Sequence, residues 1–326
     1  MKTAATILTF NRPQMLTQTL EALFSQSRPV DQVFVIDAGS TDHTPEVLRS
    51  LQKRFGERLC IKRTDDQGAS KGFRDAMEWA FQSSEATWIW VLDDDAAPAP
   101  DALEKLLSAR AASNPETGAL AGLVVKADGE VFTPNLPCTI NSATFEFQAV
   151  NFKDPKTYIN DGIPIETTSF EGILIHRRVF ETIGFHPTEY FFWFDDTDFT
   201  YSISRRFKMW LIPSAKIAHL SAFSEKEVRP PFFKAPLSYY EWPQCWRLYY
   251  RSRNFYYLLG RHASKPVALK KTIKYFARET IGAFLLRQDH LVGRLELSTK
   301  ALWDGITGRM GQRVSRKPPF IRETLK

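Results

Sequence analysis

The sequence predicts an α/β fold in which a mostly parallel central sheet is flanked by helices and followed by a basic, mainly helical C-terminal region. Three observations support this prediction. Short apolar runs alternate with amphipathic stretches over the first 125 residues, which is typical of parallel sheets. Residues 88–92 are apolar throughout, as expected of a strand covered on both faces. From residue 244 onward the pattern is helical and basic.

The elements of the first part are expected in a regular order. Strands are predicted at residues 6–10, 32–36, 59–62 and 88–92, where β-branched and other apolar side chains predominate. Asn11 and Pro13 can cap and start the first helix. Between the strands, apolar residues recur at helical spacing: Leu16, Leu20, Leu23 and Phe24, then Val47, Leu48, Leu51 and Phe55, then Phe73, Met77 and Ala80.

The pattern becomes less regular after residue 125. Residues 126–165 carry scattered Pro, Asn, Asp and Gly, which predicts long loops or irregular strands. A strand is expected at 168–176 and a short helix at 178–183. Two short strands, 208–212 and 216–220, are expected on either side of Pro213.

The composition excludes several classes of protein. Among 326 residues, 43% are hydrophobic and 25% charged, which argues against disorder and collagen-like sequence. No run approaches the roughly 20 apolar residues of a membrane-spanning helix, and the first ten residues lack the features of a signal peptide. Three cysteines without CxxC spacing indicate a reducing compartment and no zinc ribbon. We therefore expect a soluble, cytoplasmic protein.

The charge is unevenly distributed along the chain. Residues 247–326 hold 18 Lys and Arg against 5 Asp and Glu, a net charge of +13, which leaves −7 for the rest. In residues 267–287, one helical face carries Leu269, Ile273, Phe276, Ala277 and Phe284, and an adjoining face carries Lys270, Lys271, Lys274 and Arg278. This pattern is typical of a helix in an anionic membrane interface. A helix packed on the body of the protein with a solvated basic edge fits it equally well. Nucleic acid is not expected, because no nucleic-acid-binding motif is present.

Two predicted strands end in carboxylates. Asp37 ends one strand and Asp93-Asp94-Asp95 ends another, and ligands bind at the carboxyl ends of strands in open parallel sheets. Asp93 and Asp95 would point the same way from an extended segment and could share one hard divalent ion. The alternative is a solvated acidic turn that caps the following helix.

A second acidic cluster lies among aromatic residues, in the stretch 191–199. Burial beside so many rings should raise the pKa of at least one of its carboxylates toward the range of a general base. The cluster could equally be a helix start, with Asp capping the helix and complementing its dipole. His219, which follows a predicted strand, is a candidate third metal ligand or a structural histidine.

These motifs, in this order, resemble the inverting glycosyltransferases of family 2, which have the GT-A fold. The similarity covers roughly residues 3–225 and rests on four segments: Thr9-Phe10-Asn11-Arg12-Pro13, Val35-Ile36-Asp37-Ala38-Gly39-Ser40-Thr41-Asp42, Trp90-Val91-Leu92-Asp93-Asp94-Asp95 and Phe194-Asp195-Asp196-Thr197-Asp198-Phe199. Tyr249-Tyr250-Arg251-Ser252-Arg253-Asn254 is also similar to a Tyr-Tyr-x-x-Arg-Asn motif of galactofuranosyltransferases and related rhamnosyltransferases. The Gln-x-x-Arg-Trp motif of processive synthases is absent, so a processive synthase is not expected.

The resemblance implies a role for each matching residue. Asp37 would accept from the uracil or thymine ring, with Thr9 and Arg12 in the same pocket. Asp66 and Lys71 would lie near the base and phosphates, although Asp66 stands where such enzymes commonly have Asn, and Asp94 would lie at the ribose. Asp93, Asp95 and His219 would hold Mn²⁺ or Mg²⁺. Asp196 is the implied catalytic base and Asp195 the second choice, while Glu171, Trp193 and Asp198 would contact the acceptor.

The implied activity is metal-dependent, inverting transfer of a sugar from a UDP- or dTDP-sugar to a lipid-linked or polysaccharide acceptor. Galactofuranose is the first choice of sugar and rhamnose the second. Residues 1–225 would form the GT-A domain, and residues 226–326 would form the basic region on the acceptor and membrane side. The protein would then lie on the inner face of a membrane as a peripheral protein. A nucleotidyltransferase and a catalytically silent membrane-surface scaffold remain as alternatives.

Overall fold

The computed structural model describes residues 2–154, 156, 159, 161–221, 226–228, 237–286 and 289–321. The chain divides into two compact units. The first contains Met1–Ile140, Phe147–Pro187 and Asp195–Ser221, and the second contains Asn141–Glu146, Thr188–Phe194 and Ala222–Lys326. Two short segments from the middle of the chain thus belong to the C-terminal unit. The predicted domain boundary at residue 225 stays a prediction.

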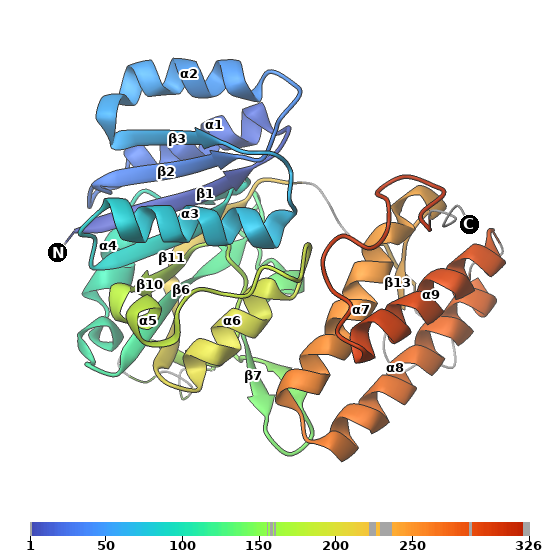
Figure 1. Ribbon diagram of the computed structural model, residues 1–326. Coiled ribbons are helices and arrows are strands. Elements are labelled where there is room, and N and C mark those ends of the chain that lie inside the picture. The colour runs from blue at the N-terminus through green and yellow to red at the C-terminus, as the bar shows by residue number, and fades with distance from the viewer. Residues whose placement is uncertain are drawn as a thin grey trace. The chain divides into compact units, whose positions relative to one another are not determined.

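The first unit is built on one mixed sheet of nine strands (Figure 1). The strand order is β3-β2-β1-β4-β10-β6-β11-β5, with β9 beside β11. The strands are β1 (Thr3–Thr9), β2 (Gln32–Asp37), β3 (Leu59–Arg63), β4 (Trp88–Asp93), β5 (Ala96–Pro98), β6 (Thr117–Val125), β9 (Ile163–Ile165), β10 (Ile173–His176) and β11 (Lys208–His219). Two short strands outside this sheet, β7 (Cys138–Asn141) and β8 (Glu146–Ala149), pair with each other.

Helices cover both faces of this sheet. Apolar residues of α1 (Pro13–Phe24), α2 (Thr44–Phe55) and α4 (Ala102–Ser108) pack on one face, in a core with Leu20, Leu48 and Leu106. Those of α3 (Ala69–Ser83), α5 (Arg177–Ile183) and α6 (Asp195–Ser204) pack on the other. The predicted α/β fold is confirmed. β4 is buried on both faces, as its uninterrupted apolar sequence predicts.

The sheet changes character in its second half. β1, β2, β3 and β4 run parallel to one another, as expected. β10 runs antiparallel to both β4 and β6, and β5 and β9 run antiparallel to β11. Of the strand predicted at 168–176, only Ile173–His176 is a strand, and it is antiparallel to both of its neighbours.

The expectation of two strands around Pro213 is wrong, because β11 is continuous from Lys208 to His219. Its pairing with β6 is interrupted between Ile212 and Lys216. Pro213 lies in this bulge, where its missing N–H costs no ladder hydrogen bond.

The second unit is mainly helical in its described residues, as the sequence predicts. It contains α7 (Cys245–His262), α8 (Lys265–Leu286) and α9 (Leu291–Ile306), together with a small hairpin of β12 (Lys226–Val228) and β13 (Leu237–Tyr239). α9 packs against both α7 and α8 (Figure 1). None of the described helices is long and apolar enough to cross a membrane.

Two helices of this unit expose apolar side chains. On α8, Leu269 is 63% exposed and Phe284 69%, and Ile273 is exposed beside them. Phe276 and Ala277 of the predicted apolar face are half-buried. Lys270 and Lys274 are exposed on the same helix, and α9 adds Val292, Leu295, Trp303 and Ile306. We call the exposed apolar side chains of these two helices the α8–α9 apolar surface: Leu269, Ile273, Phe284, Val292, Leu295, Trp303 and Ile306.

Candidate active site

Strand ends bring most of the predicted site residues to one edge of the sheet in the first unit. Parallel pairing places Thr9 opposite Asp37 and Leu8 opposite Asp93. β11 ends at His219, which pairs with Ala96 immediately after the acidic triplet. β10 runs the opposite way and begins opposite Val91, so the preceding Glu171 lies at the same edge. Ligands bind at this edge in open α/β sheets.

The acidic triplet is partly neutralised by one guanidinium. Arg12 Nη1 donates to Asp94 Oδ1 at 3.0 Å and to Asp95 Oδ2 at 2.6 Å. Thr9 Oγ1 donates to the other oxygen of Asp94 at 2.8 Å. Burial raises the pKa of Asp94 to about 6, although the charge of Arg12 acts in the opposite direction. Burial also raises the pKa of Asp93, and the neighbouring charges of Asp95 and Glu171 add to this effect.

His219 lies near two carboxylates with an unpaired ring nitrogen. Its Nδ1 is 3.9 Å from Asp95 Oδ1 and 3.7 Å from Glu171 Oε1, beyond hydrogen-bond distance. Nδ1 is buried and has no hydrogen-bond partner among the described residues. The ring stacks on Phe132 with centroids 4.2 Å apart. Burial lowers the pKa of His219 against the opposing charge of Asp95, which favours the neutral imidazole.

Glu171 is electrostatically linked to both acidic clusters. Its Oε1 accepts from Asn135 Nδ2 at 2.5 Å, and its buried Oε2 has no hydrogen-bond partner among the residues that the structure describes. Burial raises the pKa of Glu171 to about 7. The hydrogen bond from Asn135 lowers this pKa, and the charges of Asp95 and Asp196 raise it. The triplet and the aromatic-flanked cluster therefore act on one side chain.

The second cluster forms the first turn of α6, where the helix dipole favours carboxylates. Asp195 and Asp198 are buried, and Asp196 is half-buried. Asp196 Oδ1 accepts from the backbone N–H of Thr197 at 2.6 Å. Burial raises the pKa of Asp196, and burial together with the charge of Asp196 raises the pKa of Asp195 to about 8. The cluster is therefore a helix start and also contains carboxylates with raised pKa values.

The other predicted nucleotide-binding residues lie in two adjoining loops and at the start of α3. Asp37 is buried, and its Oδ1 accepts from Ser40 N at 2.8 Å. Asp66 accepts from Gly68 N at 3.1 Å, just before α3. Lys71 pairs with Asp75 on the same helix, at 2.5 and 2.6 Å. Lys71 is thus engaged within α3 in this conformation.

The residues at the sheet edge suit a hard divalent ion in their chemistry. Carboxylate oxygens and one neutral imidazole are a common donor set, and the unpaired His219 Nδ1 beside Asp95 is available as a donor. Within the described ranges, no group of three or more His, Cys, Asp or Glu side chains is arranged to hold a metal ion. The set Asp93, Asp95 and His219 stays a prediction.

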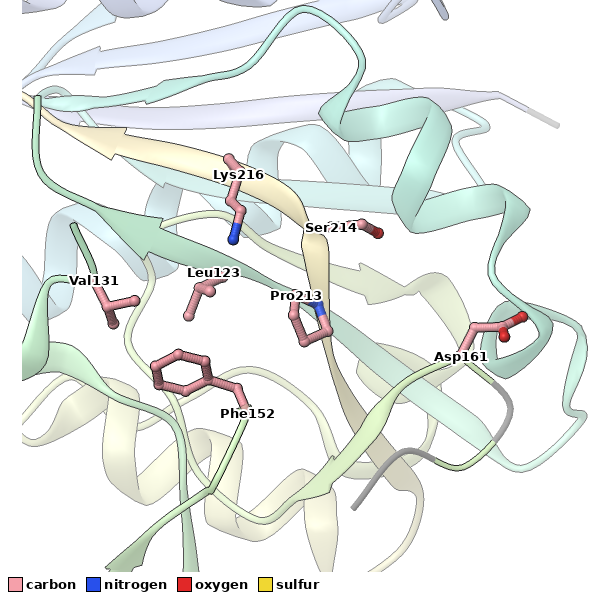
Figure 2. Close-up of a pocket in the computed structure, with 7 residues that line it drawn as sticks. All are labelled: Leu123, Val131, Phe152, Asp161, Pro213, Ser214 and Lys216. Carbon is pink, nitrogen blue, oxygen red and sulfur yellow. The ribbon is translucent and has the colours of Figure 1, made fainter. Parts of the chain in front are cut away.

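A separate pocket of about 570 Å³ lies at the bulge of β11 (Figure 2). It is lined by Leu123, Val131, Phe152, Asp161, Pro213, Ser214 and Lys216. None of the predicted site residues lines it, so the pocket and the carboxylate clusters are distinct features of the first unit.

Sequence reasoning missed several contacts of the site. It placed Arg12 at the nucleotide base, but not on Asp94 and Asp95. Asn135 comes from a stretch expected to be irregular, and no spacing singles it out. His186, whose Nε2 is 3.8 Å from Asp195 Oδ2, also went unnoticed. Trp193 lies in the second unit, and its contact with an acceptor stays a prediction.

Comparisons with known proteins agree with the resemblance seen in the motifs. The family model described as Glycosyl transferase family 2 matches residues 5–184. Galactofuranosyltransferase GlfT2 of Mycolicibacterium smegmatis is 24% identical over 300 residues, which cover 83% of this chain and 44% of GlfT2. Hyaluronan synthase of Streptococcus pyogenes is 29% identical over 110 residues, 32% of this chain and 26% of the synthase. The chain therefore matches less than half the length of these curated relatives.

Solved structures show the same fold at low sequence identity. S. aureus TarS 1–349 aligns with a TM-score of 0.57 at 13% identity, covering 95% of this chain and 82% of TarS 1–349. GalNAc-T7, crystallised with UDP, GalNAc and Mn²⁺, aligns with a TM-score of 0.58 at 12% identity, covering 92% and 54%. The family match spans more than half of the chain and favours this family over the nucleotidyltransferase alternative. The protein belongs to glycosyl transferase family 2 and has the GT-A fold.

Proposed function

We propose that this glycosyltransferase transfers a sugar from a UDP- or dTDP-sugar to a lipid-linked or polysaccharide acceptor, with inversion at the anomeric carbon. Galactofuranose is the first choice of sugar and rhamnose the second. The match to GlfT2 supports this choice, because it extends over 83% of the chain and so reaches beyond the family model. A separate mycobacterial galactofuranosyltransferase, GlfT1, is 31% identical over 95 residues.

The observation that carries the proposal is the position of Glu171, a buried carboxylate whose Oε1 lies 3.7 Å from His219 Nδ1 at the sheet edge. Inverting transfer needs a negative leaving group on one side of the sugar and a carboxylate base on the other. Charges from both the triplet and α6 act on the pKa of Glu171. A sugar between the two clusters would have its diphosphate near the triplet and its acceptor near α6, with Glu171 within reach of a sugar hydroxyl.

On the donor side, the buried carboxylate of Asp37 would accept a hydrogen bond from the pyrimidine ring. Thr9 and Arg12 would line the same pocket, Asp94 would lie at the ribose, and Asp66 and Lys71 near the base and phosphates. The guanidinium of Arg12 already binds the triplet. Arg12 therefore limits the repulsion among the three carboxylates before a nucleotide sugar arrives.

We propose that Asp93, Asp95 and His219 hold Mn²⁺ or Mg²⁺. Bound there, the ion would neutralise the charge of the leaving diphosphate. The neutral His219 ring, with its unpaired Nδ1, supports this assignment. The Mn²⁺ in the GalNAc-T7 structure belongs to that protein and supports a divalent cation here only by analogy of fold.

Asp196 is the proposed catalytic base, and Asp195 is the second choice. Asp196 is half-buried and can be reached by an acceptor, while Asp195 is held in the interior near His186. A raised pKa makes the Asp196 carboxylate a better proton acceptor. Glu171 and Trp193 are the proposed acceptor contacts. Asp198 is fully buried, and a contact with the acceptor would require movement of α6.

A donor panel tests this function. The purified protein is incubated with UDP-galactofuranose, dTDP-rhamnose, UDP-glucose or UDP-galactose, with Mn²⁺ or with EDTA, and release of the nucleoside diphosphate is measured. We expect the fastest release from UDP-galactofuranose and little release in EDTA. Asp196→Asn supplies the background for each donor. Preferential turnover of UDP-glucose or UDP-galactose would contradict the choice of sugar, and equal rates in EDTA would remove the metal.

The α8–α9 apolar surface supports a membrane as the place of the acceptor. Apolar side chains beside Lys270 and Lys274 are suited to the headgroup region of an anionic bilayer. We infer that the protein lies on the inner face of a membrane as a peripheral protein and meets a glycolipid or nascent polysaccharide there. Its exposed apolar side chains favour this interpretation over a helix buried against the body.

A further inference from the structure

The chain enters α6 through an aromatic loop with an unfavourable backbone. In this loop, Tyr190–Phe194, the φ angles of Phe191, Trp193 and Phe194 are 67°, 65° and 68°. Side chains with a Cβ rarely adopt this left-handed region, and bulky ones are disfavoured most. The next residue is Asp195, the first residue of α6. Such a loop persists only where its surroundings determine its conformation.

The side-chain amide of one residue in α7 donates hydrogen bonds to three carbonyl groups of this loop. Asn254 Nδ2 donates to Tyr190 O at 3.2 Å, to Phe192 O at 2.7 Å and to Trp193 O at 2.8 Å. Asn254 is completely buried, so water does not compete for these contacts. The three carbonyls face one donor because the left-handed residues turn the backbone inward.

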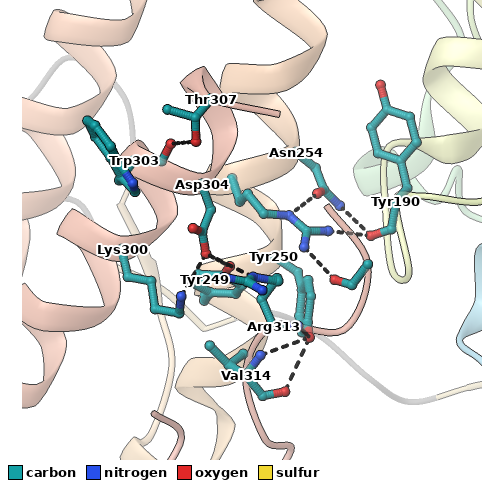
Figure 3. A network of polar contacts seen from close by, with 12 residues as sticks. Tyr190, Tyr249, Tyr250, Asn254, Lys300, Trp303, Asp304, Thr307, Arg313 and Val314 are labelled. Atoms are coloured by element: carbon teal, nitrogen blue, oxygen red, sulfur yellow. Dashed lines mark hydrogen bonds and ion pairs between the residues drawn. The ribbon is translucent and has the colours of Figure 1, made fainter. Parts of the chain in front are cut away.

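The neighbouring guanidinium fixes both the amide and the loop (Figure 3). Arg253 Nε donates to Asn254 Oδ1 at 2.8 Å, which determines which side of the amide carries the donor. Its Nη2 donates to Tyr190 O and its Nη1 to Gly311 O, both at 2.6 Å. The planar fork of arginine allows these three directions at once, and a lysine amine does not.

The ring of Tyr250 packs against this pair. Its centre lies 4.8 Å from the Arg253 guanidinium, and the Tyr250 hydroxyl donates to Val314 O at 3.2 Å. Tyr249 donates to Asp304 Oδ2 at 2.5 Å (Figure 3). The ring of Tyr249 also lies near the guanidinium, 5.7 Å away, but its hydroxyl binds α9 and not the aromatic loop.

We propose that Arg253 and Asn254 are positioning residues for glycosyl transfer: by holding the carbonyls of the aromatic loop they fix the backbone of Trp193, two residues before the first residue of α6. The inference rests on the proposed function, in which Trp193 contacts the acceptor and Asp196 takes its proton. Only Phe194 stands between Trp193 and Asp195, and Asp196 is the next residue, so a rotation of the loop backbone would be passed along the chain to the base. Donor binding, which involves other residues, is not part of this role.

The test uses Asn254→Asp, which keeps the size of the side chain and its acceptor to Arg253 but replaces the donor by an oxygen. That oxygen would face three carbonyl oxygens, so the loop should open while the remainder of α7 stays folded. Arg253→Lys is the second variant, in case Asn254→Asp folds poorly. Tyr249→Phe is the matched control, because it removes the buried hydrogen bond to Asp304 from the same helix and keeps the ring that lies near Arg253.

Three quantities are measured: amide hydrogen exchange of the peptide 189–196, kcat and KM for the acceptor, and the Kd for UDP. For Asn254→Asp and Arg253→Lys we expect faster exchange in 189–196 only, a fall in kcat of at least tenfold with a raised acceptor KM, and a UDP Kd within twofold of wild type. For Tyr249→Phe we expect a lowered Tm with kcat and KM near wild type.

Two results would overturn the inference. One is an Asn254→Asp enzyme with wild-type kcat and acceptor KM. The other is a loss of activity in all variants that follows their loss of Tm, which would indicate a purely structural role. If wild-type protein transfers no sugar at all, the proposed function fails. The exchange of 189–196 then decides by itself whether the pair holds the loop.

Discussion

At the scale of single residues, Asp196 and Asp195 are adjacent in the chain and differ in accessibility. Asp196→Asn keeps the size of the side chain but cannot take a proton from the acceptor. We expect turnover to fall by the roughly 10²–10⁴-fold typical of a lost general base, with UDP affinity near wild type. Steady-state transfer kinetics and calorimetry with UDP measure the two quantities.

Asp195→Asn is the matched control for this prediction. It should retain most of the turnover, because Asp195 is buried and the acceptor would meet Asp196 first. An inactive Asp195→Asn beside an active Asp196→Asn would reverse the assignment. If both variants keep their activity, no carboxylate of this pair is the base.

The raised pKa of Asp195 also predicts a pH dependence of stability. Burial raises this pKa from about 3.9 in the unfolded chain to about 8 in the folded protein. Between these values the folded state holds a proton that the unfolded state has lost, so the free energy of unfolding falls as pH rises. Asp195→Asn removes this contribution. The Tm of the variant relative to wild type should therefore increase from pH 5 to pH 8 in thermal melts.

Asp42→Asn is a suitable reference for these melts. Asp42 is exposed and accepts hydrogen bonds from Thr44. Burial alone would raise its pKa, but these hydrogen bonds together outweigh burial, so the pKa lies below the ordinary value. Its contribution to stability should be constant above pH 5. A difference between Asp195→Asn and wild type that does not change with pH would show that Asp195 is ionised in the folded protein.

Residue identity predicted which acidic residues gather at the candidate site better than it predicted their contacts. The triplet, Asp37 and the α6 carboxylates could be found because each follows a strand or an aromatic run. The contact of Arg12 with Asp95 joins positions 83 apart in the chain, and that of Asn135 with Glu171 joins positions 36 apart. Such pairs depend on strand order and loop path, which a local pattern does not contain.

At the scale of elements, the packing of α7 against α9 depends on Gly305. A Cβ built there would lie 2.6 Å from Arg253 O and 2.8 Å from Tyr256 Cβ, closer than real Cβ contacts. Gly305→Ala should therefore destabilise the protein by about 1–3 kcal/mol, the cost of overpacking. Urea or thermal unfolding followed by circular dichroism measures this change.

Gly260, also within a helix, provides the contrast. A Cβ at this position meets nothing within 4 Å. Gly260→Ala should stabilise the protein by about 0.5–1 kcal/mol, because alanine has less backbone freedom to lose on folding. Similar destabilisation by both substitutions would mean that helix packing is not what separates them.

Sequence periodicity predicted the elements well where strands and helices follow one another directly along the chain. β1 to β4 and α1 to α3 were expected close to their observed positions. The second half of the sheet was predicted less well, because β10 inserts between β4 and β6 from a distant part of the chain. The continuity of β11 through Pro213 was missed because a proline usually ends a strand, and only pairing with β6 reveals the bulge.

At the scale of the whole molecule, the uneven charge predicts salt-sensitive attachment to membranes. The protein should sediment with anionic liposomes at low salt and be released as salt increases, because polybasic attraction is screened within a Debye length. Reversing the charges of Lys270, Lys271 and Lys274 should reduce sedimentation. Transfer to a soluble short acceptor should be unchanged, since these lysines lie outside the site.

Neutral liposomes and a surface variant elsewhere control for non-specific adsorption. Arg49 and Lys53 on α2 are surface cations of the first unit, and their charge reversal should leave sedimentation unchanged. If wild-type protein ignores anionic liposomes at low salt, the α8–α9 apolar surface has another partner.

The bulge of β11 determines where a residue can be inserted into or deleted from this strand without moving His219. Alternate residues of a strand face the same side of the sheet, so Met209, Leu211 and Ile217 would share one side in a regular strand. Instead, Met209 and Leu211 lie in the core on one side, and Ile217 lies in the core on the other. The alternation is reset because Ile212 pairs with Gly122 while Lys216 pairs with the next residue, Leu123. Ser214 stands exposed between them. An insertion or deletion there would leave His219 beside Asp95, whereas one elsewhere in the strand would turn the histidine to the other side of the sheet.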